Sequence, residues 1–204
     1  KKEVVFNLDE VDGNNNFFVE DLLAHNRAGY YSYYSDPTCF SANVDITLSD
    51  GTFKKINDIE VGDVVRGWDG KTTEVGGKVI AVDHRHTVGS HDEACKSLGD
   101  EPSLYTITLN DYGSGHTGIE FTPEHPFLTK EGWKSLVPDP NQEPYKSEQE
   151  PKVLEVGDEI NLNGEWKSIE SISIVRSDSE EKVYNITVEG IHSYLANGIV
   201  VHNK

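Results

Sequence analysis

The sequence predicts an all-β fold made of two similar subdomains. Short segments with alternating apolar and polar residues recur along the whole chain, and glycine-containing turns separate them. Such alternation is typical of half-buried strands, whereas long stretches with helical periodicity are absent. Several of these segments recur in the same order in the second half of the chain, which indicates an internal duplication.

The composition limits the classes of function that the chain can serve. At 204 residues it can bury a full core, as one large β-domain or two small ones. Its formal net charge of −18 disfavours nucleic-acid and anionic-membrane partners, because such a surface repels phosphate groups. No apolar run reaches the length of a membrane span. The two cysteines, Cys39 and Cys95, are too few for a disulfide scaffold and leave the cellular compartment open.

Residues 1–38 precede the regular strand pattern. Within them, residues 4–26 read VVFNLDEVDGNNNFFVEDLLAHN and are similar to VYNITVEGIHSYLANGIVVHN, residues 183–203, which we call the closing segment. From a shared glycine onward the two align without gaps, and both end in His-Asn. Chance similarity between two hairpins is the alternative. We expect residues 4–26 to be a partial copy of the closing segment, followed by an aromatic, turn-rich connector.

The next part of the chain predicts short strands and tight turns. In order, we expect a strand at 44–48, a turn at 49–51, a strand at 52–54, a turn or 3₁₀-like bridge at 56–61, a strand beginning at 62–63, a hairpin turn at 68–71 and a strand at 78–82. Residues 83–103 are polar and are predicted to form an inserted surface loop.

The second half of the chain returns to strands after this loop. We expect a strand at 104–109, a Gly-rich loop, the segment FTPEHPFLT at 121–129, a flexible, exposed excursion rich in proline at 138–152, strands within 153–175, and the closing segment. In the closing segment, Asn197-Gly198 lies between two strand-like runs, which is a strong signal for a β-hairpin.

The duplication shows in three matched blocks. IEVGD at 59–63 matches LEVGD at 154–158, residues 79–82 match 172–175, and YTIT at 105–108 matches YNIT at 184–187. Each half ends on a strand that leads into a histidine, His125 in the first and His202 in the second. We expect two β-subdomains related by a pseudo-two-fold axis, which would bring both histidines and the ends at Cys39 and Asn203 into one cleft.

Residues 39–203 resemble a Hint domain of the intein or bacterial intein-like kind. The blocks that carry the resemblance are CFSANVDITLSDG, FTPEHPFLT and the closing segment, in this order. The resemblance implies a horseshoe-shaped Hint fold, residues 1–38 as an upstream flank like an N-extein, and Lys204 as a downstream flank. It also implies autocatalytic processing by a monomer whose partner is its own flanking polypeptide, without a cofactor or an endonuclease domain.

The upstream junction would react through a thiol. Cys39 can attack the carbonyl carbon of Thr38 and convert the amide into a thioester. A free cysteine has a pKa of about 8.5, so the site must activate the thiol. Taken alone, a buried and unreactive cysteine is the alternative reading. Thr122 and His125 match the T-x-x-H block of the family. The resemblance implies that His125 hydrogen-bonds the scissile amide nitrogen and later protonates the leaving amine, and that Thr122 orients this peptide or holds the imidazole.

The downstream junction would react through an amide. The side-chain nitrogen of Asn203 can attack its own carbonyl carbon, which cuts the Asn203–Lys204 bond and leaves a succinimide. This step needs donors to polarise the carbonyl and a proton for the leaving amine. By resemblance, His202 and His192 are the candidates for this role. For His192, an exposed turn residue without a role is the alternative.

Two positions depart from the family pattern. Lys204 stands where splicing inteins carry Cys, Ser or Thr, so the usual branched intermediate cannot form, and cleavage at either end is expected rather than efficient splicing. Asn185 stands where the family often has Asp, and an amide cannot act as a carboxylate base. These departures also favour the alternative function, a Hint fold kept as a slow or non-cleaving structural module of a larger virion or secreted protein.

A metal-binding β-domain is the third hypothesis for the function. Its candidate ligands lie in the polar loop, and they are His84, His86, His91 and Cys95. Their spacing corresponds to no established zinc site, so we expect a solvated loop and no bound metal.

Overall fold

The computed structural model describes residues 16–19, 22–25, 38–86, 104–110, 118–138, 144–145, 152–175 and 181–203. The chain divides into two compact units, Lys1–Asp36 and Pro37–Lys204. Among the described residues, no helix has the length and apolar character needed to cross a membrane.

The smaller unit contains one antiparallel hairpin. Its strands are β1 (Asn16–Val19) and β2 (Leu22–His25). Asn16 pairs with His25, and Val19 pairs with Leu22 across a two-residue connection. This hairpin lies within residues 4–26, where the sequence resembles the closing segment.

The described part of the larger unit consists of short strands, two long strands and one 3₁₀-helix. Its first half contains β3 (Phe40–Ser41), β4 (Asp45–Thr47), β5 (Phe53–Lys55), the 3₁₀-helix η1 (Ile56–Asp58), β6 (Val64–Gly67), β7 (Val75–His86), β8 (Leu104–Leu109) and β9 (Ile119–Phe121). Its second half contains β10 (Phe127–Thr129), β11 (Gly132–Ser135), β12 (Lys152–Val153), β13 (Glu159–Leu162), β14 (Glu165–Val175), β15 (Lys182–Val188), β16 (Ser193–Ala196) and β17 (Ile199–His202).

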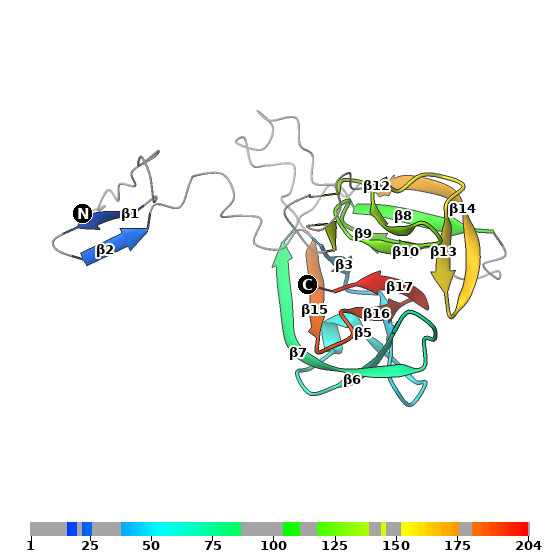
Figure 1. Cartoon of the computed structure of the whole chain (residues 1–204), viewed down its shortest axis with the longest axis horizontal. Coiled ribbons are helices and arrows are strands. Elements are labelled where there is room, and N and C mark those ends of the chain that lie inside the picture. The colour runs from blue at the N-terminus through cyan, green and yellow to red at the C-terminus, as the bar shows by residue number, and fades with distance from the viewer. Residues whose placement is uncertain are drawn as a thin grey trace. The chain divides into compact units, whose positions relative to one another are not determined.

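The two halves exchange strands within the sheet. The described strands of this unit pair in the order β5-β4-β16-β17-β10-β13-β14-β8-β9-β3-β15-β7-β6. Off this path, β11 pairs with β10, and β12 pairs with β11. Strand β8 of the first half therefore lies beside β14 of the second, and β15 of the second half lies between β3 and β7 of the first. The long strands β7 and β14 curve along opposite sides of the unit (Figure 1).

The repeated I/L-E-V-G-D blocks form the same turn in both halves. In each turn the aspartate side chain accepts the main-chain N–H of the residue three positions earlier: Glu60 N–H to Asp63 Oδ2 and Glu155 N–H to Asp158 Oδ2 are both 2.9 Å. The glycine between them has a positive φ in both copies, 104° at Gly62 and 96° at Gly157. This local identity supports the predicted pseudo-two-fold relation.

The strands after these turns match in a different register from the predicted one. Val79 N–H donates to Asp63 O and Ile169 N–H donates to Asp158 O, both at 2.8 Å, so residues 79–82 correspond to 169–172 and not to 172–175. Both strands also carry a one-residue register shift at equivalent positions, residue 80 in β7 and residue 170 in β14. A bulge reverses which residues point inward and which point outward. The pattern of apolar residues alone therefore could not identify the correct alignment of the two strands.

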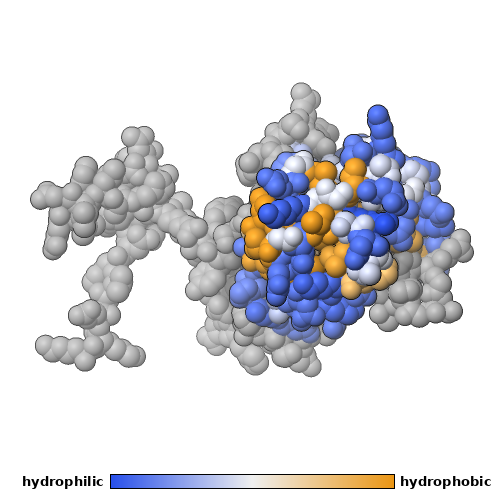
Figure 2. All heavy atoms as spheres, turned by 90° about the horizontal axis from the view of Figure 1, so that it is seen from below, coloured by the Kyte–Doolittle hydropathy of each residue, from blue (hydrophilic) through white to orange (hydrophobic). Residues whose placement is uncertain are grey.

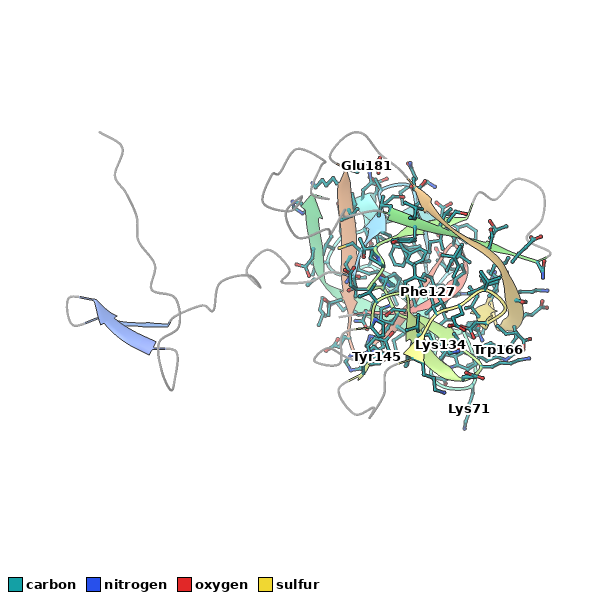
Figure 3. All side chains as sticks on the ribbon, turned by 90° about the horizontal axis from the view of Figure 1, so that it is seen from above. Lys71, Phe127, Lys134, Tyr145, Trp166 and Glu181 are labelled. Atoms are coloured by element: carbon teal, nitrogen blue, oxygen red, sulfur yellow. The ribbon has the colours of Figure 1, made fainter. Side chains whose placement is uncertain are left out.

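The core lies between the two halves. Large buried side chains from both contribute to it, including Phe40, Phe121 and Phe127. The rings of Phe121 and Phe127 pack edge to face with centroids 4.7 Å apart. In Figure 3 Phe127 lies in the interior of the unit, whereas Lys71 extends outward. On the face drawn in Figure 2, apolar residues are interspersed with polar ones.

The predicted excursion at 138–152 needs a correction. Tyr145 is 2 % exposed and is one of the largest buried side chains, and Lys152 and Val153 pair in parallel with β11. Burial of a large aromatic ring is strongly favourable, so Tyr145 is buried although the surrounding Pro- and Glu-rich sequence predicts an exposed segment. Within 138–152, the structure describes residues 138, 144, 145 and 152, and the rest of the excursion lies outside the described residues.

The predicted loop at 83–103 begins later than expected. Strand β7 continues to His86 because β15 pairs along its length, from Lys182 opposite His86 to Val188 opposite Val79. The sequence does not reveal this distant partner, so the strand prediction at 78–82 was too short. Residues 87–103, which include His91 and Cys95, lie outside the described residues.

Candidate functional site

Thr122 holds the main chain of Cys39 on both sides. The Cys39 N–H donates to Thr122 Oγ1 at 2.9 Å, and Thr122 N–H donates to the Cys39 carbonyl oxygen, also at 2.9 Å. Both residues are buried, with exposures of 2 % and 4 %. The peptide nitrogen that would leave in a thiol attack at Thr38 is therefore fixed by the threonine of the T-x-x-H block.

The residue before the cysteine is also fixed. Asn185 Nδ2 donates to Thr38 Oγ1 at 3.0 Å. Asn185 Oδ1 in turn accepts the main-chain N–H of Ile186 at 2.8 Å and the hydroxyl of Tyr194 at 2.9 Å. Asn185 and Tyr194 are fully buried. Strand β15 thus places an oriented amide against the upstream junction.

His125 is enclosed by aromatic rings. Its main-chain N–H donates to Thr122 O at 3.0 Å, which forms the turn between β9 and β10. The imidazole is fully buried, 4.0 Å from the Phe40 ring and 6.5 Å from the Tyr194 ring, measured between centroids. Within the described part of the chain, neither ring nitrogen makes a hydrogen bond of regular geometry, although the main-chain carbonyl of His202 interacts with the ring. A buried polar group of this kind is rare and is available for a reacting group.

Burial keeps the His125 imidazole neutral. It lowers the pKa of His125 well below the usual value of 6.5, and the nearby His202 lowers this pKa further. The main-chain carbonyl of His202 acts in the opposite direction, by favouring the protonated ring, but only in part. A neutral imidazole can accept the proton of a thiol and pass it to a leaving amine.

Hydrogen bonds hold Asn203 in place at the predicted downstream junction. Its main-chain N–H donates to the carbonyl oxygen of His192, and its side-chain Nδ2 donates to Val188 O, both at 3.1 Å. The residue is 2 % exposed. The carbonyl that accepts from Nδ2 polarises the N–H bond. This polarisation raises the nucleophilicity of the nitrogen that would close the ring.

His202 lies between this asparagine and the T-x-x-H turn. Its N–H donates to Pro126 O at 3.1 Å, and its ring packs edge to face on Trp133 with centroids 5.0 Å apart. Burial lowers the pKa of His202 to about 4, the main chain of Asn203 partly offsets this, and the charge of His192 lowers it further.

His192 is placed differently from the other candidates. Its side chain is exposed and its φ of 47° lies in the left-handed region. Its contact with the downstream junction is the carbonyl oxygen that accepts from Asn203. The structure therefore brings its main chain, and not its imidazole, against the asparagine.

Two elements contact both predicted junctions. The turn at 122–126 bonds Cys39 at its start and His202 at its end. Strand β15 bonds Thr38 through Asn185 and Asn203 through Val188. Three residues along a strand span about 10 Å, so the two ends of the domain lie close to one another. The predicted site residues at 38, 39, 122, 125, 185, 202 and 203 come together, whereas Lys204 lies outside the described residues.

Sequence reasoning missed Tyr194 and the carbonyl of Val188. A tyrosine at a strand position that alternation predicts to be buried needs a partner for its hydroxyl, and this signal could have identified Tyr194. A main-chain carbonyl leaves no signal in the sequence. For the metal hypothesis, the described residues contain no group of three or more ligand side chains that could hold an ion. His84 is exposed, and its ring lies 6.3 Å from that of Tyr184.

Comparisons with known proteins point to one group. Residues 46–203 match the family described as the intein splicing domain. A solution structure of a bacterial intein-like domain from Clostridium thermocellum is 24% identical, with a TM-score of 0.59, and the match covers 82% of this chain and 100% of that chain. No curated protein matches the sequence.

Two crystal structures are similar to the same extent. A DnaB intein from Synechocystis sp. PCC 6803 is 23% identical, with a TM-score of 0.56 and coverage of 82% of this chain and 99% of that chain. The gp41-1 intein is 22% identical, with a TM-score of 0.54 and coverage of 82% and 100%.

Proposed function

The chain belongs to the intein splicing domain family, whose members process their own polypeptide, and we propose that this one cleaves its flanks rather than splicing them. The membership confirms the predicted all-β Hint fold. The observation that carries the proposal is the shared contact of the T-x-x-H turn and strand β15 with both junctions. Residues 1–38 would be the upstream flank, residues 39–203 the domain, and Lys204 the downstream flank.

The upstream step forms a thioester. The sulfur of Cys39 bonds to the carbonyl carbon of Thr38, and the bond from that carbon to the Cys39 nitrogen breaks. The thiol proton goes to the released amine, and we assign its transfer to the imidazole of His125, which burial keeps neutral. The two hydrogen bonds between Cys39 and Thr122 support this step, because they hold the nitrogen and the carbonyl of Cys39 in place.

The downstream step closes a ring. Asn203 Nδ2 bonds to its own carbonyl carbon, the bond to the Lys204 nitrogen breaks, and a succinimide remains. One proton leaves Nδ2 and one reaches the departing amine of Lys204. The two hydrogen bonds on Asn203 support this geometry, and the neutral ring of His202 next to it can relay the proton.

Lys204 is the reason that cleavage is favoured. Splicing needs a hydroxyl or thiol at this position to take the acyl group from the thioester, and an ammonium group cannot do so. Attack of the released Lys204 α-amine on the thioester would ligate the flanks, but only as a minor route. The products would then be a free upstream flank, a free domain and a free downstream flank.

A structural role is the second candidate function. Asn185 cannot act as the carboxylate base that often stands at this position in the family, and both of its amide atoms are engaged in hydrogen bonds. The domain would then cleave slowly or not at all, within a larger virion or secreted protein.

The test uses the chain extended beyond Lys204 by a short peptide. We expect its intact mass to show loss of the downstream peptide on its own and release of residues 1–38 with added thiol at neutral pH. Cys39→Ala should block only the upstream cleavage and Asn203→Ala only the downstream cleavage, while Asn110→Ala, at an exposed position, controls for loss of an amide. A chain that stays full-length with thiol refutes cleavage and favours the structural role.

The preference for cleavage has a separate test. Replacing Lys204 by Cys restores a nucleophile, so a ligated product of the two flanks should increase relative to the parent. If the parent already yields mainly the ligated product, the proposed preference is wrong.

A further inference from the structure

The residue before Cys39 sits in a polar contact that the processing steps do not use. Thr38 is 8 % exposed, and its hydroxyl faces Asn185 Nδ2 at 3.0 Å. Asn185 is 0 % exposed and belongs to β15, in the second half of the domain. A side chain of the upstream flank is thus bound by an amide that the chain supplies 147 residues later.

The orientation of that amide is fixed by its neighbours. The main-chain N–H of Ile186 can only donate, so the atom of Asn185 that faces it at 2.8 Å must be the oxygen. The Tyr194 hydroxyl donates to the same oxygen at 2.9 Å. The other end of the amide is therefore the NH₂ group, and the group opposite it at residue 38 must accept a hydrogen bond.

We propose that Asn185 and Tyr194 form a binding position for the side-chain hydroxyl of the residue before Cys39, so that the domain selects Thr or Ser at this place. The proposal rests on the proposed upstream cleavage and names a specificity for it. Asn185 binds the flank directly, and Tyr194 is a positioning residue that keeps the amide from turning over. The hydroxyl thereby anchors Thr38 and holds its carbonyl carbon against the thiol.

This arrangement distinguishes between substitutions of similar size. Thr38→Ser keeps the hydroxyl, whereas Thr38→Val keeps the shape but removes the acceptor. We expect thiol-dependent release of residues 1–38 to slow about tenfold in Thr38→Val and to stay close to the parent rate in Thr38→Ser. Tyr194→Phe should slow the Thr38 chain several-fold and change the Thr38→Val chain little, since the contact that it orients is already lost.

A second measurement tests the binding position without cleavage. In a Cys39→Ala background, Thr38→Val should lower the melting temperature by about 3 °C, since it removes one buried hydrogen bond. Thr47→Val is the matched control, because Thr47 is 5 % exposed and its hydroxyl has no partner among the described residues, so no loss is expected there. Tyr184→Phe, on β15, is the control for loss of a tyrosine hydroxyl.

The outcomes separate this inference from the proposed function. If the parent does not release residues 1–38 with thiol, the proposed upstream cleavage fails, and the melting temperatures still test the hydroxyl contact. Equal losses in Thr38→Val and Thr47→Val, or independent and additive effects of Thr38→Val and Tyr194→Phe, would overturn the binding position. So would a Thr38→Val chain that is cleaved at the parent rate.

Discussion

Mild acid should destabilise the fold through its buried imidazoles. Burial lowers the pKa of His202 to about 4 and that of His125 well below 6.5. In the unfolded chain a histidine has a pKa of about 6.5, so below this pH the unfolded state binds protons that the folded state does not. The free energy of unfolding therefore falls as the pH falls from 6.5 to about 4, and it is unaffected by these groups at higher pH.

The size of the effect follows from the pKa of His202. Each pH unit between the unfolded and folded pKa values costs about 1.4 kcal/mol per histidine. Between about pH 6.5 and about pH 5, His202 alone should lower the free energy of unfolding by about 2 kcal/mol. His125 adds a further loss in the same direction.

Urea unfolding at about pH 7.5 and about pH 5 measures this loss. The chain should carry Cys39→Ala and Asn203→Ala so that it stays intact. Because carboxylates also titrate in acid, the informative quantity is the difference between this chain and one that also carries His202→Gln, in which the loss should shrink by about 2 kcal/mol. His84→Gln controls for replacing an exposed imidazole. The same pH dependence with and without His202→Gln would refute the argument.

Three further changes test other contacts. Thr122→Val removes the hydroxyl that accepts the Cys39 N–H, so we expect a loss of about 2 kcal/mol in urea unfolding and slower thiol-dependent release of the upstream flank. Lys134 pairs with Asp158 at 2.7 Å, and the two side chains are 8% and 16% exposed. Lys134→Met leaves this partly buried carboxylate without its cation and should cost about 3 kcal/mol in urea unfolding. Asp63, the matching aspartate of the first half, pairs with Lys54 at 2.8 Å, and both side chains are more exposed, at 25% and 30%. Lys54→Met should therefore cost about 1 kcal/mol or less, and equal losses would contradict this reasoning. Gly198→Ala forces a side chain into a φ of 78° and should lower stability by about 1–2 kcal/mol in thermal unfolding, where an unchanged melting temperature would exclude the strain.

Local chemistry made parts of the fold predictable from sequence. Asn197 and Gly198 both adopt positive φ, 48° and 78°, as a two-residue hairpin turn of the Asn-Gly type requires. The Gly-Asp pairs of the repeated turns form because each glycine tolerates positive φ and each aspartate bonds the main chain nearby. Such features depend on a few adjacent residues, so the sequence reveals them.

Features that depend on distant partners were not predictable. The length of β7 follows from its pairing with β15, and the match between the halves follows from bulges at equivalent positions. Tyr145 is buried although its neighbours in the sequence are polar, so local composition does not predict its burial. In the site, the roles of Cys39 and Asn203 came from the resemblance, whereas the contact of Asn185 with Thr38 needs the folded strands.

The exchange of strands between the halves has a consequence for timing during synthesis. Cys39 leaves the ribosome long before Asn185, yet β3 pairs with β15, and Thr38 is bound by a residue of that strand. A nascent chain that ends before β15 lacks the strand that pairs with β3 on one side and β7 on the other, although β9 and β6 are already present. The first junction is therefore incomplete until translation has passed residue 188. The upstream bond is therefore expected to be cleaved only after the later half of the chain has been synthesised and folded.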